Sequence, residues 1–460
     1  MKTLVLGGGF AGMAAALRLA LEGHEVTLLE RESVLGGKAQ GWNGIPTGPT
    51  VLTMAEVVRS LFARAGAVPP VLHPVSPLTR YLYPDGREFA PELAQGPTLA
   101  QLEAPEKKRY VELLETAHRL YDDAKNTFLL SKPPELWNLA KYGLKSGTRA
   151  FPLTSLEKLV QSGPYLTPFF LRFATYLGAN PYMAPAVLHN IAWVELGMGV
   201  WHAEGGFVAL VNQMAGLLEK FGVTVELGVD VKALEQQGGR VTAAVTSSGT
   251  FRAEKFVSAL DRIFTLELLG RPIPRYPLGV SGFALLLRLE ESFPLSHQVF
   301  FPQDYALEWS EIAAGRLPSD PTIYLHTDGE RAFVLVNSPA VPQVHKARTG
   351  PIGAALSKTQ YAQFLLERLQ KRIHLPVLEK GVRAAQDYSR FGFRGALYGR
   401  APSGLLSTLR HKWQFAGVGN LWQVGGTVHP GGGVPLSLLS GWNGAGQALG
   451  LEFDALGLNG

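Results

Sequence analysis

The stretch that decides the fold is Thr3-Leu4-Val5-Leu6-Gly7-Gly8-Gly9-Phe10-Ala11-Gly12, near the start of the chain. Its apolar first part predicts a short buried strand, and a segment rich in Ala and Leu with helical periodicity follows the glycines as far as Gly23. A second apolar strand, Val26–Leu29, then ends on the acidic Glu30. This order of strand, glycine turn, helix and strand predicts the start of a parallel α/β sheet.

The glycines of this turn have the spacing of a dinucleotide-binding fingerprint. Gly7 makes the tight turn, Gly9 lets the backbone approach a pyrophosphate, and Gly12 lets the helix pack closely on the strand. The phosphates then lie on the helix N-terminus, where free N–H groups and the macrodipole favour negative charge. Glu30 is placed to accept hydrogen bonds from the ribose hydroxyls of an adenosine. A secretory signal is the competing interpretation, but the preceding glycines and the charged Arg18 argue against it.

The residues after the acid favour FAD over NAD. Arg31 follows directly, and Gly36-Gly37-Lys38 forms a second glycine turn with a basic residue. NAD enzymes rarely need such a turn, whereas flavoproteins that hold an extended FAD use its backbone and basic side chain. We therefore expect FAD as the cofactor.

Length and composition exclude several classes of function. The chain has 460 residues, which is too long for one compact core, so two interleaved domains are expected. It has no cysteine, which excludes disulfides, thiolate catalysis and Cys-ligated metal. Its net charge is +5 with only 18% charged residues, and no basic block with interleaved aromatics predicts a nucleic-acid surface.

The pattern typical of a nucleotide-binding domain returns around Gly205-Gly206 and again near the C-terminus. We therefore predict an α/β fold in which a Rossmann-type FAD-binding domain is discontinuous, over residues 1–70, 196–270 and 405–460. An α+β substrate domain, over residues 71–195 and 271–404, is expected to be interleaved with it.

The segment 125–172 is basic and rich in large apolar side chains. It carries seven Lys or Arg residues against two acids, together with aromatics such as Phe169 and Phe170. This composition suits helices that face a membrane surface or the mouth of a pocket for a lipid-like substrate. The alternative is a cap whose aromatics face its own core. No apolar run reaches the about 18 residues that a membrane-spanning helix needs.

A third glycine loop lies in the C-terminal stretch. Asn420–Val424 resembles a strand, Gly425 to Gly433 form the loop, and a helix follows Val434-Pro435. The N-terminus of that helix could stabilise the negative charge that develops on the flavin during hydride transfer. We interpret His429 as a residue that fixes the loop rather than as a catalyst.

Together these motifs resemble the bacterial-type phytoene desaturases, FAD-dependent carotenoid desaturases related to the amine oxidases. The matching segments are Gly7 to Glu30, Gly36-Gly37-Lys38, Gly48-Pro49-Thr50, Gly178 to Tyr182, Gly199-Val200-Trp201, Gly205-Gly206, Asp261, Asp320 to Tyr324 and the intact His429 to Pro435. The resemblance spans nearly the whole chain and implies an amine oxidase-like fold. The candidate cofactor-binding residues are Gly7, Gly9, Phe10, Ala11, Gly12, Glu30, Arg31, Gly36, Gly37, Lys38, Gly48, Pro49, Thr50, Val231, Asp261, Gly425, Gly432, Gly433, Val434 and Pro435.

The resemblance implies an enzyme that removes hydride and a proton from an apolar isoprenoid to form conjugated double bonds. Quinone or oxygen is expected as the electron acceptor, because no second nicotinamide fingerprint is visible. We expect a cytoplasmic protein, peripheral on the inner face of the cell membrane. The sequence identifies no catalytic residue and no metal site. Two alternatives stay open: an amine oxidase-like enzyme acting on a small amine, and a flavin-free protein of the same fold that binds lipid or prenyl groups.

Overall fold

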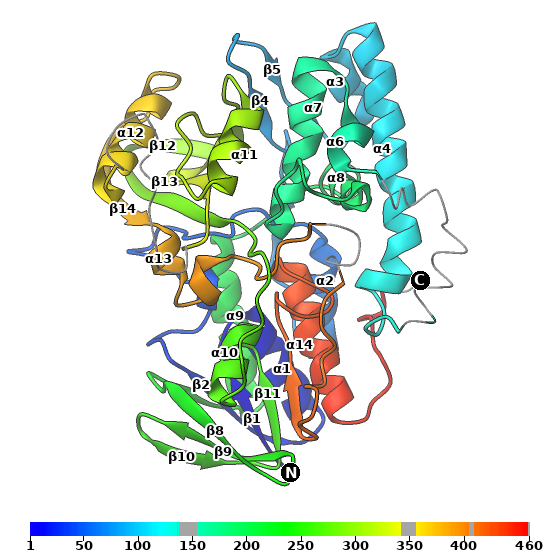
Figure 1. Ribbon diagram of the computed structural model, residues 1–460, viewed down its shortest axis with the longest axis vertical. Helices are drawn as coiled ribbons and strands as arrows, with labels where there is room; N and C mark the ends of the chain where they lie inside the picture. The colour runs from blue at the N-terminus through cyan, green and yellow to red at the C-terminus, as the bar shows by residue number, and fades with distance from the viewer. Residues whose placement is uncertain (136, 138–153, 342–355, 404–408, 459–460) are drawn as a thin grey trace.

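The computed structural model of the chain describes residues 1–135, 137, 154–341, 356–403 and 409–458. Its lower part in Figure 1 is built on a five-stranded sheet with the order β15-β11-β1-β2-β7, in which all neighbouring strands are parallel. The strands are β1 (Lys2–Leu6), β2 (Glu25–Glu30), β7 (Thr224–Leu227), β11 (Lys255–Ser258) and β15 (Leu421–Gln423). The α/β Rossmann-type fold predicted from the N-terminal stretch is therefore confirmed.

Both faces of this parallel sheet are covered, which explains why Leu4, Val5 and Leu6 of the first strand are all apolar and buried. Alternate side chains of β1 point to opposite faces. Leu4 and Leu6 pack with an antiparallel three-stranded sheet and with helix α10 (Arg262–Leu268), whereas Val5 packs with helices on the other face. The antiparallel sheet consists of β8 (Val231–Gln237), β9 (Arg240–Thr246) and β10 (Gly249–Arg252).

The first and last long helices of the chain lie side by side on the face that carries Val5. They are α1 (Phe10–Leu21) and α14 (Val434–Ala448), drawn in blue and red in Figure 1. Gly441 makes the close approach feasible, because a Cβ atom there would lie 2.1 Å from the carbonyl oxygen of Ala11. Helices α2 (Ala55–Arg64) and α9 (Gly206–Lys220) pack beside them.

The upper part of the molecule combines a second sheet with a group of helices. This sheet has the order β13-β12-β4-β5, and β14 pairs with β12. Its strands are β4 (Arg80–Leu82), β5 (Glu88–Phe89), β12 (Ser281–Phe300), β13 (Ile323–Ser338) and β14 (Val377–Arg383). A short ribbon pairs β3 (Leu72–Pro74) with β6 (Trp201–Ala203). The helices are α3 (Gln95–Ala100), α4 (Ala104–Ala124), α6 (Leu156–Val160), α7 (Gly163–Leu171), α8 (Asn190–Leu196), α11 (Tyr305–Ala313), α12 (Lys358–Gln370) and α13 (Ala385–Tyr388).

The strands of the parallel sheet come from three stretches of the chain, residues 2–30, 224–258 and 421–423. The stretches between them supply the second sheet and its helices. The domain boundaries placed at residues 70, 195, 270 and 404 stay a prediction.

The basic and aromatic segment 125–172 is only partly described. Lys141, Lys145 and Arg149 lie outside the described residues. Phe169 and Phe170 are fully buried in the core of the upper part, so these two aromatics face the protein's own core and not a membrane. Within the described ranges, no helix has both the length and the apolar character needed to cross a bilayer.

Candidate functional site

Two glycine turns face each other at the carboxyl edge of the parallel sheet. Gly7 adopts a φ of +95°, and a Cβ atom at Gly12 would lie 1.9 Å from the Gly7 carbonyl oxygen, so the helix can begin there only with glycine. A Cβ atom at Gly37 would lie 3.3 Å from the Cα atom of Gly9. The two turns predicted from the sequence therefore form one narrow cradle of backbone.

The C-terminal glycine loop closes the same site from the other side. Gly425 and Gly433 have φ angles of +107° and +95°, and α14 begins directly after Gly433. Neither α1 nor α14 has a side-chain cap or an acidic residue in its first turn. Two helix N-termini with unpaired N–H groups thus open on one space, which favours a ligand with negative groups.

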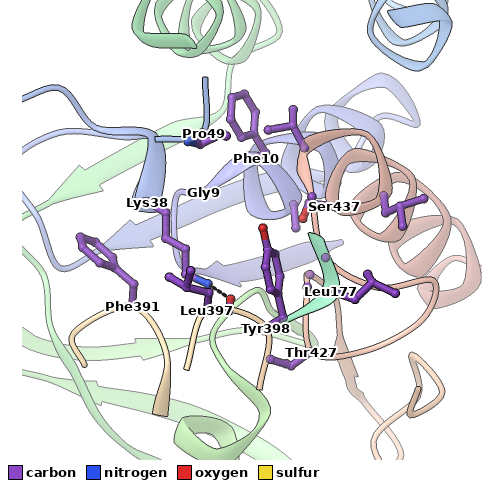
Figure 2. A pocket seen from close by; sticks show the side chains of 18 of the residues that line it. Gly9, Phe10, Lys38, Pro49, Leu177, Phe391, Leu397, Tyr398, Thr427 and Ser437 are labelled. Atoms are coloured by element: carbon purple, nitrogen blue, oxygen red, sulfur yellow. Dashed lines mark hydrogen bonds between the residues drawn. The ribbon is translucent and has the colours of Figure 1, made fainter. Parts of the chain in front are cut away.

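A single large cavity connects these segments, with a volume of about 1650 Å³. Except for Gly12, which packs underneath the first turn, every candidate cofactor-binding residue lines it. Figure 2 shows Phe10, Lys38 and Tyr398 converging on it from three separate segments. Because ligand pockets usually measure about 300–1,000 Å³, the cavity has room for a dinucleotide and a second ligand together.

Glu30 is fixed at the tip of β2 by backbone donors. One carboxylate oxygen accepts a hydrogen bond from the Gly8 N–H at 2.6 Å, and the other accepts one from the Glu32 N–H at 2.9 Å. The side chain is 7% exposed and lines the cavity. Each oxygen keeps a lone pair for a further donor, so the carboxylate can accept hydrogen bonds from a ribose.

We expect Glu30→Ala to weaken FAD retention about tenfold or more. Hydrogen bonds to a charged acceptor contribute about 1.5–3 kcal/mol, and about 1.4 kcal/mol corresponds to tenfold in affinity. Flavin absorbance after gel filtration and a reconstitution titration measure the effect. Glu25→Ala, at the exposed start of the same strand, is the matched control and should leave the flavin content unchanged. Equal flavin retention in the two variants would contradict this role of Glu30.

Three buried charged side chains, Lys38, Asp261 and Arg410, surround the glycine cradle. Burial lowers the pKa of Lys38, whose ammonium group donates to the Leu397 carbonyl oxygen. Burial raises the pKa of Asp261, which accepts hydrogen bonds from the N–H groups of Ile263 and Phe393. Burial also lowers the pKa of Arg410 to about 10, and its Nη2 atom has no partner in the described part of the chain. Buried cations with donors to spare fit the pyrophosphate of a dinucleotide.

His429 holds the C-terminal loop through its ring and its backbone. Its Nε2 atom lies 2.8 Å from the Ser131 carbonyl oxygen, and its own carbonyl accepts hydrogen bonds from Trp413 and Ser440. Burial lowers its pKa to about 4, so the ring is neutral. These contacts agree with the interpretation of His429 as a residue that fixes the loop.

Sequence reasoning missed the polar groups on the opposite wall of the cavity. Arg172, the last residue of the basic segment 125–172 for which a membrane surface, a pocket mouth and a cap core all stayed open, is buried there and pairs with the fully buried Glu195 at 3.3 Å. Tyr324 also lines the cavity, and its hydroxyl group lies 2.7 Å from the Thr50 hydroxyl. In the sequence, Tyr324 stood out only as the last residue of the family-matching segment Asp320 to Tyr324. That match did not indicate what the tyrosine does.

Comparison with known proteins identifies relatives of the whole chain. Residues 10–262 match the family model described as flavin containing amine oxidoreductase. Hydroxyneurosporene desaturase of Cereibacter sphaeroides is 31% identical, with 96% of both chains covered. The 1-hydroxycarotenoid 3,4-desaturase of a Flavobacterium species is 27% identical, covering 95% of this chain and 97% of that protein. In fold, the chain is similar to cyclohexylamine oxidase from Brevibacterium oxydans, with a TM-score of 0.61, 15% identity and coverage of 97% and 98%.

Proposed function

Because the chain belongs to the flavin-containing amine oxidoreductases, and among them to the carotenoid desaturases, we propose that it removes two hydrogen atoms from an acyclic carotenoid that carries a hydroxyl group near one end. The protein is an FAD-dependent oxidoreductase. The observation that supports the proposed substrate is the wall of the cavity opposite the glycine cradle, which is apolar apart from a few buried polar groups.

The glycine cradle, Glu30 and the two helix N-termini would hold FAD in an extended form. When bound, FAD accepts hydride. The chain itself has to bind the polyene beside it, keep water out and receive the proton that leaves the neighbouring carbon. The apolar wall is suited to the first two tasks because a polyene has no polar group to hydrogen-bond along most of its length.

The apolar wall of the cavity is supplied by several elements of the upper part. It includes Leu177, Val187, Leu188, Ile191, Val194, Val299 and Leu335. Van der Waals contact with these side chains and the release of water favour binding of a long hydrocarbon. A small charged amine would gain little from such a wall.

Arg172 and Glu195 offer one polar point in this apolar surrounding. The Nη2 atom of Arg172 contacts both Glu195 carboxylate oxygens at 3.3 Å, and its Nε atom donates to the Tyr81 hydroxyl at 3.0 Å. The Nη1 group forms no hydrogen bond with any described residue and can donate to a substrate hydroxyl group. The names of both desaturase relatives, hydroxyneurosporene desaturase and 1-hydroxycarotenoid 3,4-desaturase, include a hydroxylated carotenoid, which supports the same class of substrate for this chain.

The electron acceptor and the location of the enzyme are further parts of this proposal. We propose a quinone or oxygen as the acceptor. A substrate that partitions into lipid favours a site of action at the inner face of the cell membrane.

Product analysis tests the proposed function. The purified FAD-loaded protein is incubated with a hydroxylated acyclic carotenoid and a quinone, and with the same polyene lacking the hydroxyl group. We expect a product that has lost two hydrogen atoms, a longer-wavelength absorbance maximum, and faster turnover of the hydroxylated polyene. An oxygenated product, or turnover of amines with peroxide release and no change to the carotenoid, would overturn the proposal.

A further inference from the structure

A chain of polar contacts leaves the cavity through the second sheet. The Thr50 hydroxyl lies 2.7 Å from the Tyr324 hydroxyl, and the Tyr324 hydroxyl lies 2.7 Å from Nδ1 of His297. Thr50 belongs to the Gly48-Pro49-Thr50 loop that lines the cofactor end of the cavity, and Tyr324 lines the same cavity. The tyrosine hydroxyl therefore joins the reaction space to a histidine behind it.

Further imidazole rings continue this line toward the surface. His297 and His326 are directly opposite each other on β12 and β13, with stacked rings whose centres are 4.8 Å apart. The ring of His202 follows at 6.4 Å from that of His326. His202 is opposite His73 on the ribbon of β6 and β3, and His73 is exposed. Four histidines thus lead from the back of Tyr324 to solvent.

The inner two histidines are neutral and only weakly basic at rest. His297 and His326 are 2% and 3% exposed, and burial lowers the pKa of both, that of His326 to about 4. The charged groups that face this line are Arg172 and Glu195 on the cavity side, Asp328 and Arg331 farther out, and Glu204, which lies 3.7 Å from the His73 ring at the surface.

His297 also has a buried ring nitrogen without a function in the fold. Its Nε2 atom finds no hydrogen-bond partner within the residues that the structure describes. A buried polar atom without a partner costs about 1–3 kcal/mol, so its presence calls for a role outside the packing of the fold.

We propose that Tyr324 accepts the proton that the substrate loses and that His297 relays it outward, an inference that rests on the proposed desaturation. Two C–H bonds of the polyene break. The electrons of one leave with hydride to FAD, and the electrons of the other form the new double bond. The proton from that second carbon goes to the Tyr324 oxygen while the hydroxyl proton of Tyr324 moves to Nδ1 of His297. The step leaves His297 as an imidazolium, and its ring is stacked on that of His326 with 4.8 Å between the ring centres.

A weak base is sufficient for this step. Loss of hydride from a polyene leaves a delocalised cation, whose neighbouring C–H bond is strongly acidic. Glu195, a carboxylate on the same wall, already accepts hydrogen bonds from Arg172, Tyr176 and Thr79, so its lone pairs are engaged within the fold. Tyr324 lines the cavity and is hydrogen-bonded to His297, whose neighbouring imidazole rings lead toward the surface.

Removing the tyrosine hydroxyl tests the proposal in turnover. We expect Tyr324→Phe to lower kcat about 10²-fold or more, with KM and flavin content unchanged and a larger isotope effect for substrate deuterated at the carbon that loses the proton. The matched control is Tyr83→Phe, which removes a buried hydroxyl bonded at 3.0 Å to the Tyr165 carbonyl oxygen, outside the cavity lining. Its kcat should stay at the wild-type value. An unchanged kcat in Tyr324→Phe would overturn the proposal.

Replacement of His297 is a second, independent test of the proposal. His297→Ala should lose activity that added imidazole restores, because the free base can occupy the vacated space. His189→Ala is the control, since His189 is fully buried, has one unpartnered ring nitrogen in the described structure and does not line the cavity. It should neither lose kcat in the folded fraction nor respond to imidazole. A His297→Ala variant with wild-type kcat would overturn the relay.

A spectroscopic readout separates the relay from turnover. In the FAD-free protein labelled with ¹⁵N-histidine, His297 should be the neutral tautomer with its proton on Nε2, and Tyr324→Phe should shift its Nδ1 signal. A proton on Nδ1 in the wild-type protein would overturn the relay, since Tyr324 could not then donate to that atom. Failure of the wild-type enzyme to change any carotenoid would instead overturn the proposed function, and the relay with it.

Discussion

Gly12→Ala should leave the protein without bound FAD. The added Cβ atom would lie 1.9 Å from the Gly7 carbonyl oxygen and 3.2 Å from the Cβ atom of Ala259. The nearest atom belongs to the backbone of the first glycine turn, so relief requires that this turn move away from the position in which it would meet the pyrophosphate. Overpacking of this kind costs about 1–3 kcal/mol and occasionally more, and a backbone contact lies at the upper end. We therefore expect FAD affinity to fall about a hundredfold, measured by reconstitution of the apoprotein.

Gly216→Ala is the matched control for this substitution. Gly216 lies in helix α9 of the same part of the molecule, is exposed, and would place a new Cβ atom in open space. Alanine in a helix interior is about 1 kcal/mol more favourable than glycine, so this variant should retain FAD and unfold at a slightly higher temperature. If both variants retain flavin, FAD binding does not require the close packing of Gly12 against the first glycine turn.

Glu195→Gln should lower the free energy of unfolding by about 3–5 kcal/mol, the cost of leaving one partner of a buried ion pair without the other. Arg172 is 8% exposed and Glu195 fully buried, and the glutamate accepts further hydrogen bonds from Thr79, Tyr81 and Tyr176. The substitution keeps the shape of the side chain and removes its charge. Denaturant unfolding followed by tryptophan fluorescence measures the loss.

A combined variant distinguishes loss of charge balance from loss of packing. Arg172→Met, Glu195→Leu, Tyr81→Phe and Tyr176→Phe together replace the polar group by apolar side chains of similar size. Such replacements are often neutral or stabilising, so this variant should recover most of the stability lost in Glu195→Gln while turning over a hydroxylated carotenoid no faster than one without the hydroxyl group. A combined variant less stable than Glu195→Gln would show that the pair contributes net stability.

The cofactor half of the site could be predicted because its chemistry is local in sequence. Gly7, Gly9 and Gly12 act within one turn, and Glu30 follows at the end of the next strand, so spacing alone predicts their meeting. The strand before Gly425, and the glycine turn and helix after it, have the same order and were predicted in the same way. The 20-residue length of β12 was not predicted.

The substrate half could not be predicted because its polar groups meet only through tertiary structure. Tyr324 and His297 are 27 positions apart and come together through the register of two antiparallel strands. Composition could not place Arg172, since a basic residue among aromatics has the same pattern on a membrane-facing helix, at a pocket mouth and in a buried ion pair. Its partner Glu195 lies on a different helix, so the spacing of residues along one helix could not predict that the two side chains meet.

The position of β15 and α14 has a consequence for biosynthesis. Residues 421–448 complete a sheet and a helix pair begun by residues 2–21, so the contacts that finish the nucleotide-binding layer have nearly the largest sequence separation the chain allows. At about 5–20 residues per second of translation, helix α1 waits on the order of a minute on the ribosome for its partner helix α14. Flavin loading is then a post-translational event, and rapid overexpression should favour colourless, aggregation-prone chains over holoenzyme unless a chaperone protects the apolar face of the first helix.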